Sequence, residues 1–347
     1  MNKKTDQFSY LKIFRHGDKI AKYQSAETPF PISVDLSASN FCNHKCIWCV
    51  YSKFLNQSKD ILGKDILFRL IDDLNNIGVK GINFTGGGEP LTNKFTVDAM
   101  EKAYSLGMDV GLITNGSLLD KESIRRLVKI TKYIRISLDA GTPDTYSKLH
   151  QTNIKEFEKV LSNIEYMGMS VCDTNCRVGI QLLLVEENNK EFFSFIEKIK
   201  NWGIHFVEIR PAINIHGDVN EVDLADEETY FKSLEDMGND HLKVIVRRER
   251  FRLRFGYGKN YNRCISPHFV SAFGADGNIY TCCELLGYKD NILGNFMENT
   301  LRDIFQFNRL EEKLLCLNLN SCPKYCKTDE INRAFNFLRN IEHYNIL

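Results

Sequence analysis

Short apolar runs alternate with amphipathic stretches through most of this chain. Between residues 32 and 213 the apolar runs have the length of buried strands, and the stretches between them repeat apolar residues at helical spacing. The runs predict six strands, at Ile32–Leu36, Gly81–Thr85, Asp109–Thr114, Tyr133–Leu138, Arg177–Val185 and Phe206–Arg210. The stretches predict helices near residues 64–77, 94–106, 120–130, 153–167 and 189–202, several of them ending at a glycine.

Repeated strand–helix units predict a parallel sheet with right-handed crossovers. A closed barrel takes eight such units and about 250 residues, whereas residues 32–213 hold six. We therefore predict an α/β fold, a partial (β/α)6 barrel of the TIM type with a small cysteine-rich α+β module at its C-terminal end. A flat doubly wound sheet fits the alternation less well.

The segments on either side of this region are shorter and more polar. Two apolar runs around a turn at Gly17 predict a small hairpin extension within residues 1–31. Residues 214–262 form a polar connection with a predicted helix near residues 225–237. The run Arg250–Phe255 alternates arginines with apolar residues, which predicts a strand. Its three arginines can hold an anionic substrate, but we favour a solvated edge strand.

The last part of the chain, residues 263–347, predicts a small module. Asp276-Gly277 is typical of a hairpin turn and lies between strand-like runs at Val270–Phe273 and Ile279–Thr281. A polar C-terminal helix follows.

Composition narrows the class of protein. The 45 basic and 45 acidic residues cancel, so no global field attracts nucleic acid or membranes. No stretch approaches the roughly eighteen apolar residues of a membrane span, and the N-terminus lacks the apolar core of a signal peptide. We therefore expect a cytoplasmic protein, where eleven cysteines indicate metal binding or catalysis more than disulfides.

Three of these cysteines lie close together just after the first predicted strand. Cys42, Cys46 and Cys49 are separated by three and then two residues. Three thiolates at this spacing can hold three corners of an iron–sulfur cube and leave its fourth iron open. A zinc site that includes His44, or free thiols, are the alternatives.

Polar residues and glycines follow the next three predicted strands. Gly86-Gly87-Gly88-Glu89-Pro90 follows the second strand, Asn115 follows the third, and the fourth carries Ser137 and Asp139. Ligands of parallel α/β folds bind at the carboxyl ends of the strands. We therefore expect these residues and the cysteines on one rim.

The cysteine spacing, with Trp48 before the third cysteine, resembles the radical S-adenosylmethionine (SAM) superfamily. The resemblance spans about residues 32–213 and implies a [4Fe–4S] cluster on Cys42, Cys46 and Cys49 that binds SAM and generates a 5′-deoxyadenosyl radical. It also implies SAM contacts at Trp48, Gly87, Gly88, Glu89, Asn115, Ser137 and Asp139, with Glu89 meeting the methionyl ammonium.

A second set of cysteines resembles a shortened auxiliary-cluster module called twitch, a relative of the SPASM domain. Cys264, then Gly277, then Cys282 match its first half, and Cys322 and Cys326 can supply two more ligands. The resemblance implies a second, auxiliary [4Fe–4S] cluster. The denser cysteine pattern of a full SPASM domain is missing, Cys283 competes with Cys282 as a ligand, and a zinc ribbon is the alternative.

Such a pair of clusters resembles the arrangement in radical SAM dehydrogenases. We predict two-electron oxidation of a sugar-like or other small-molecule alcohol, with the auxiliary cluster as electron acceptor and a flavodoxin or ferredoxin as electron donor. Candidate bases or substrate contacts near the fifth and sixth strands are Arg177, Glu208, Arg210 and His216.

Two alternative reactions fit the same cysteines. One is modification of a ribosomally made peptide, by thioether formation or epimerisation, although the short N-terminal segment argues against an appended peptide-binding domain. The other is sugar epimerisation, which needs a hydrogen donor such as a cysteine outside both clusters. The spare cysteines are Cys172, Cys176, Cys283 and Cys316, which as buried thiols can equally be small apolar residues.

Overall fold

One twisted sheet of ten strands runs through the whole computed structural model, which describes residues 9–55, 58–212, 222–253, 259–322 and 326–339. The strand order is β10-β9-β8-β1-β2-β3-β4-β5-β6-β7. The strands are β1 (Ser33–Leu36), β2 (Gly81–Phe84), β3 (Asp109–Thr114), β4 (Thr131–Ser137), β5 (Arg177–Leu184), β6 (Phe206–Pro211), β7 (Lys243–Val246), β8 (Val270–Phe273), β9 (Asn278–Tyr280) and β10 (Ile292–Asn295).

The strands from β8 through β1 to β7 are all parallel, whereas β9 and β10 are antiparallel to their neighbours. Within the described residues β7 and β10 end the strand order, so the sheet curves into an arc without closing. The predicted α/β class and partial barrel are confirmed.

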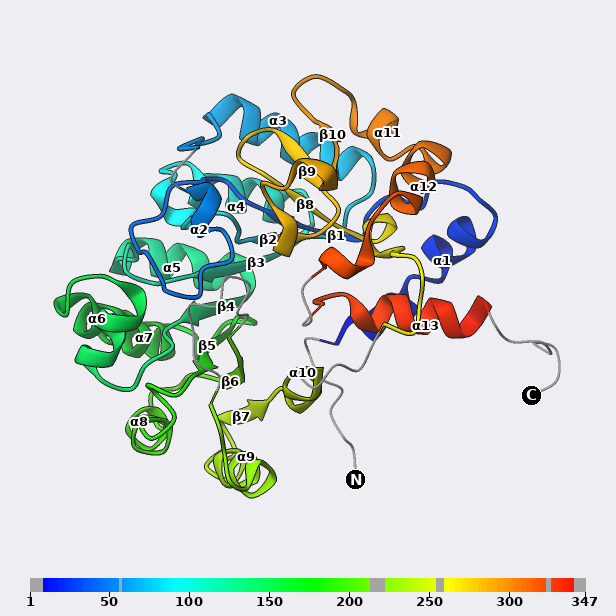
Figure 1. The fold of residues 1–347 in the computed structure, drawn as a ribbon. Helices are drawn as coiled ribbons and strands as arrows, with labels where there is room; N and C mark the ends of the chain where they lie inside the picture. Colours follow the sequence, from blue (N-terminus) through cyan, green and yellow to red (C-terminus); the bar gives the residue numbers. More distant parts are fainter. Residues whose placement is uncertain (1–8, 56–57, 213–221, 254–258, 323–325, 340–347) are drawn as a thin grey trace.

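Helices cover the outer face of this arc (Figure 1). They are α3 (Lys64–Asn76), α4 (Thr96–Ser105), α5 (Lys121–Ile130), α6 (Pro143–His150), α7 (Lys155–Ser170), α8 (Phe192–Ile199) and α9 (Glu227–Glu235). The apolar stripe of each helix packs on the sheet; in α5, for example, Ile124, Leu127 and Val128 are buried at helical spacing and a capping box at Asp120 fixes the start.

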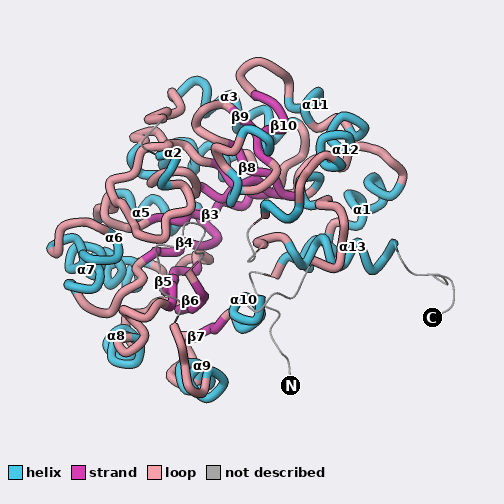
Figure 2. The backbone as a smooth tube through the Cα atoms, viewed as in Figure 1, coloured by secondary structure: helices cyan, strands magenta, loops and turns pink. Residues whose placement is uncertain are grey.

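Most of the remaining helices belong to the N-terminal and C-terminal segments, and one follows β7 at the end of the strand order (Figure 2). The α-helices are α1 (Gly17–Gln24), α2 (Ser52–Leu55), α10 (Arg248–Leu253), α11 (Leu301–Ile304), α12 (Phe307–Leu315) and α13 (Asp329–Arg339). The 3-10 helices are η1 (Tyr10–Arg15), η2 (Pro90–Thr92), η3 (Ser266–His268), η4 (Cys283–Leu285), η5 (Lys289–Asn291) and η6 (Leu319–Ser321).

The N-terminal hairpin predicted within residues 1–31 is wrong. Its described part forms η1 and α1, because Ile13, Ile20 and Tyr23 present one apolar face to Phe269 and to Phe335 of α13. Helical spacing, rather than alternation, brings these residues to one side.

The strand predicted at Arg250–Phe255 is also wrong where the structure describes it. Residues 248–253 form α10. The ring of Phe251 packs against the ring of Phe231 in α9, with the ring centres 4.5 Å apart. The hairpin at Asp276-Gly277 is confirmed as β8 and β9. Because β8 pairs with β1, the C-terminal module extends the sheet of the barrel.

Candidate active site

The loop between β1 and α3 carries the first three cysteines. Burial raises the pKa of each thiol, that of Cys42 to about 12, and the neighbouring charges of Cys49 and Cys42 raise the pKa of Cys46 further. The three sulfur atoms thus interact with one another in a half-buried setting, where thiolates need a cation to balance their charge. Iron bound by cysteine thiolates fits this donor set.

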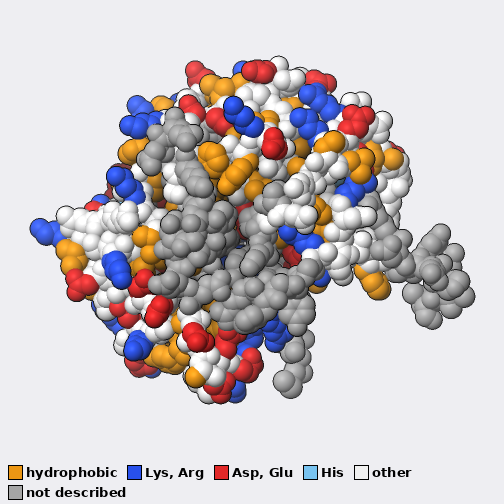
Figure 3. Space-filling model, in the orientation of Figure 1, with side chains coloured by type: hydrophobic (Ala, Val, Ile, Leu, Met, Phe, Trp, Pro, Cys, Tyr) orange, Lys and Arg blue, Asp and Glu red, His pale blue; other side chains and the backbone are white. Residues whose placement is uncertain are grey.

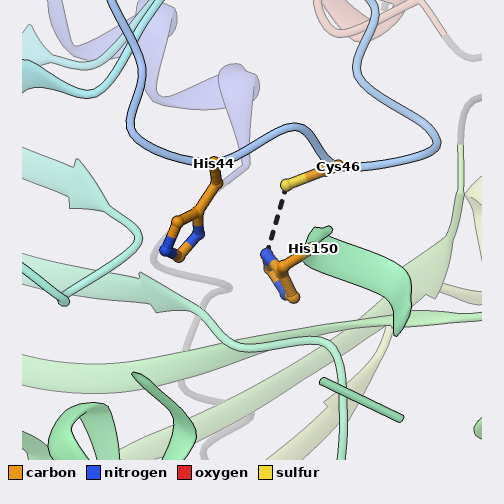
Figure 4. A group of neighbouring side chains, drawn as sticks. All are labelled: His44, Cys46 and His150. Carbon is orange, nitrogen blue, oxygen red and sulfur yellow. Dashed lines mark hydrogen bonds between the residues drawn. The ribbon is translucent and has the colours of Figure 1, made fainter. Parts of the chain in front are cut away.

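Two histidines flank the middle cysteine (Figure 4). His150, at the end of α6, approaches the Cys46 Sγ with its Nδ1 at 3.1 Å, and its Nε2 lies 2.9 Å from the Leu138 carbonyl oxygen. The ligand atoms of His44, Cys46 and His150 lie within 4.8 Å of one another, and neither ring nitrogen of His44 has a hydrogen-bond partner. These three donors also suit zinc. Cys46 therefore belongs to two possible ligand sets, the three cysteines of the loop and the group of His44, Cys46 and His150.

The glycine-rich turn after β2 packs directly on the cysteine loop. A Cβ atom added to Gly88 would lie 2.2 Å from the Phe41 carbonyl oxygen, and one added to Gly86, whose φ is +130°, would lie 2.5 Å from Ser37. The backbone amides of Gly88 and Glu89 donate to the carbonyls of Ser39 and Phe41, both at 3.0 Å. Only glycine permits this approach.

Glu89 ties the same turn to the end of β3. Its Oε1 accepts from the Thr114 hydroxyl at 2.5 Å, and its Oε2 accepts from the Asn115 amide at 2.8 Å. Asn115 donates in turn to the Asn43 side chain at 2.9 Å. The predicted contact of Glu89 with the SAM ammonium stays a prediction. In this structure its carboxylate joins the glycine-rich turn to the end of β3 through hydrogen bonds.

The end of β4 brings Ser137 and Asp139 to the same rim. Asp139 has a φ of +59° and is buried, and its Oδ1 accepts from the Leu183 amide at 2.7 Å. Burial raises its pKa to about 7, against the opposing charges of Arg210 and Arg135. Trp48 packs edge-on against His150 with ring centres 5.8 Å apart. The rim therefore unites the predicted residues, while their individual SAM contacts stay predictions.

The second set of cysteines lies on the module side of the interior. Burial raises the pKa of Cys322 and Cys326, and the charge of Cys264 raises both further. The pKa of Cys282 is raised chiefly by a hydrogen bond with the Cys283 thiol and then by burial, and the charge of Cys326 adds to it. The Cys283 thiol therefore lies beside that of Cys282; it is also hydrogen-bonded to Asp35 on β1, and the Tyr51 hydroxyl donates to the Cys283 carbonyl at 2.8 Å.

The predicted base candidates fall in three different places. Arg177 is the first residue of β5, at the end of the strand opposite the rim, so it is wrong as a site residue. His216 lies outside the described residues. Glu208 and Arg210 on β6 point inward, where Glu208 pairs with Arg135 and Arg247. Although burial raises its pKa, the surrounding arginines lower it well below the ordinary value, which makes Glu208 a poor base.

Several interior residues have no sequence signal of their own. Arg135 and Arg247 reach Glu208 through the register of β4, β6 and β7, and Lys327 reaches Asp35 on β1 from the segment before α13. Arg135 is a charge inside the otherwise apolar part of β4, which is a signal visible in the sequence. No helix among the described residues is long and apolar enough to cross a membrane.

Comparison with known proteins tests these interpretations. Residues 36–199 match the Radical SAM superfamily. A Saccharolobus islandicus protein named "Probable GTP 3′,8-cyclase" is 26% identical over 279 residues, which cover 74% of this chain and 83% of that protein. A GTP 3′,8-cyclase from Campylobacter lari is 31% identical over 194 residues, 53% of this chain and 57% of that protein.

Solved structures agree in fold. Streptococcus suis SuiB bound to S-adenosylmethionine superposes with a TM-score of 0.68 at 17% identity, covering 92% of this chain and 77% of SuiB. Native anSMEcpe with bound AdoMet gives 0.58 at 19% identity, covering 86% and 88%. The family match favours the iron–sulfur reading of Cys42, Cys46 and Cys49 over zinc. Residues 36–199 therefore match a radical SAM domain.

Proposed function

We propose that this chain is a radical SAM enzyme that holds a second iron–sulfur cluster and oxidises an alcohol carbon of a small polar substrate by two electrons. The observation that supports it most is the position of the second set of cysteines. The Tyr51 hydroxyl, two residues from Cys49, donates to the Cys283 carbonyl at 2.8 Å, so the two cysteine loops touch beside one barrel interior.

The ligands we assign to the second cluster are Cys264, Cys282, Cys322 and Cys326. Cys282 is preferred over Cys283 because its spacing from Gly277 matches the twitch pattern and because the Cys283 thiol is hydrogen-bonded to Asp35. Four thiolates close a cubic cluster and leave no iron open, which suits electron transfer rather than substrate binding.

When bound, the first cluster and SAM would supply the radical that removes a carbinol hydrogen atom, and the second cluster would accept the remaining electron as the hydroxyl proton leaves. The side chains of the barrel would bind the substrate and shield the radical from solvent. Asp35, Asn83 and Tyr133 form a hydrogen-bonded row across the interior, with the Tyr133 hydroxyl 2.8 Å from Asn83 and Asn83 3.0 Å from Asp35. Such a polar, buried row suits a hydroxylated substrate. We expect a flavodoxin or ferredoxin as electron donor.

The test is the mass of the product formed by the anaerobically reconstituted enzyme with SAM and a panel of sugars, aminocyclitols and nucleotides. Oxidation predicts a product lighter by two hydrogens, with one SAM cleaved per product. The Cys282→Ala variant should still cleave SAM but make no oxidised product. Full product formation by that variant would refute the role of the second cluster.

A redox-neutral reaction is the second candidate, because the Cys283 thiol faces the barrel interior and because relatives at 26% identity carry the name GTP 3′,8-cyclase. Cyclisation or epimerisation leaves the substrate mass unchanged. Deuterium gained from heavy water, and lost in Cys283→Ser, would indicate hydrogen return from Cys283 to an epimerised carbon. Unchanged mass without deuterium would favour ring closure.

A further inference from the structure

A cluster of arginines occupies the barrel interior beyond the row just described. In register, Ser137, Gln181 and Glu208 lie beside one another on β4, β5 and β6. Arg135 lies two residues before Ser137 and Arg210 two residues after Glu208, so all point to the same face. That face is the interior, because the alternate residues, such as Ile136 and Ile180, are buried in the main apolar core.

Charge in a barrel interior is unusual, since branched apolar side chains ordinarily fill it. Glu208 is 3% exposed, and its two oxygens are both taken: Arg135 donates to Oε2 at 2.9 Å and Arg247 to Oε1 at 2.6 Å. One carboxylate thus holds two guanidinium groups in place. Their orientation is fixed before any ligand arrives.

Arg210 adds a third guanidinium beside the same carboxylate. Burial, and then the charge of Arg135, lower the pKa of Arg210, and Arg250 of α10 contributes in the same direction. Glu208 and Asp139 act on Arg210 in the opposite direction. Burial raises the pKa of Asp139 to about 7, which weakens it as a counter-ion.

Several polar atoms around the cluster are buried and have no hydrogen-bond partner. They include Nε of Arg135, Nε of Arg210 and Oε1 of Gln181, whose residue is only 6% exposed. Buried polar atoms are ordinarily paired, so atoms left unpaired beside a surplus of cations indicate a ligand.

We propose that Arg210, together with Arg135 and Arg247, binds an oxyanion of the substrate, a carboxylate or a phosphate group, inside the barrel. The fork of a guanidinium matches either group in two hydrogen bonds. Arg135 lies on β4, Arg210 lies on β6 and Arg247 directly follows β7, whereas the cysteine loop and the glycine turn follow β1 and β2. This site would therefore hold the far end of a substrate whose reacting carbon points to the rim. This inference takes from the proposed function only that substrates enter the barrel.

The test is calorimetric titration of the iron-loaded, SAM-saturated enzyme with inorganic phosphate in one arm and acetate in the other. Saturable binding of one ion per chain is expected, and the tighter arm identifies the group. Arg210→Gln should weaken binding on the order of ten-fold or more. It leaves Glu208 paired with Arg135 and Arg247, so the fold should survive. Arg126→Gln, which removes a guanidinium from the outer face of α5, should bind as wild type.

Arg210→Lys keeps the charge but not the fork, and its affinity should lie between those of wild type and Arg210→Gln. Absence of saturable binding by wild type, or equal binding by Arg210→Gln, would overturn the inference. Binding that appears only without SAM would assign the arginines to the SAM carboxylate and would equally overturn it. Each result is obtained without turnover, so it is independent of whether the substrate is oxidised.

Discussion

At the scale of single residues, the tightest constraint on the site is the contact of Gly88 with the cysteine loop. We predict that Gly88→Ala lowers the free energy of unfolding by about 2 kcal/mol, because a Cβ would lie 2.2 Å from the backbone oxygen of Phe41 and would force the backbone to shift. It should also lower SAM affinity, since the turn and the cysteine loop would separate.

Denaturant unfolding and SAM titration measure the two effects. Gly17→Ala is the matched control, because nothing lies within 4 Å of a Cβ at that glycine. A Gly88→Ala protein as stable as the control and equally able to bind SAM would contradict this account of the turn.

Glu208 gives a pH prediction. Its pKa is lowered in the folded protein, so the native state binds fewer protons than the unfolded state below pH of about 4.3. Its contribution to stability is thus complete above that pH and is lost as pH falls towards the folded pKa. Between pH 6 and pH 3.5 this loss amounts to about 1 kcal/mol. Unfolding free energies of wild type should therefore fall more steeply than those of Glu208→Gln; parallel curves would be the contrary result.

The residues of the rim were predictable to different degrees. Cys42, Cys46, Cys49, Gly88 and Glu89 carry their chemistry in a local spacing that the sequence displays directly. His150 and Arg247 do not, because each reaches the site from a distant segment through sheet register or helix packing. A site assembled from residues on different strands has no local pattern in the sequence.

At the scale of elements, α10 is the informative departure from expectation. The run Arg250–Phe255 alternates like a strand, yet Arg248–Leu253 is helical. The fully buried ring of Phe251 packs on Phe231 of α9, and this packing stabilises the helix more than the alternating pattern favours a strand. The strands of the barrel were predictable because long apolar runs buried on both faces are typical of parallel sheets. The strand β7 was not, because its three apolar residues lie between Lys243 and Arg247 within a polar stretch of the chain.

The position of Phe251 predicts a large mutational effect. Phe251→Ala should lower the free energy of unfolding by about 3–5 kcal/mol, as expected for a buried aromatic ring. Arg252→Ala, one residue further on and exposed, should change it by less than about 0.5 kcal/mol. Equal effects at the two positions, measured by denaturant titration, would contradict the helix.

At the scale of the whole molecule, the barrel and the C-terminal module share one sheet through the pairing of β1 with β8. Phe273, Ile279 and Leu293 of the module belong to the same apolar core as the barrel strands. We therefore predict that a chain ending at residue 262 fails to fold, because it exposes the β1 edge together with this apolar surface. Gel filtration and thermal unfolding measure this. A soluble, cooperatively unfolding fragment would show that the barrel is independent.

Two cysteine sets that hold two clusters on either side of one substrate site determine the iron content of the chain. Anaerobic iron and acid-labile sulfide analysis of the reconstituted protein measures this content. We predict about eight irons per chain, and about four both in the Cys42→Ala/Cys46→Ala/Cys49→Ala variant and in the Cys264→Ala/Cys282→Ala variant. About four irons in wild type, unchanged by the second pair of substitutions, or zinc in place of the second cluster, would contradict the account.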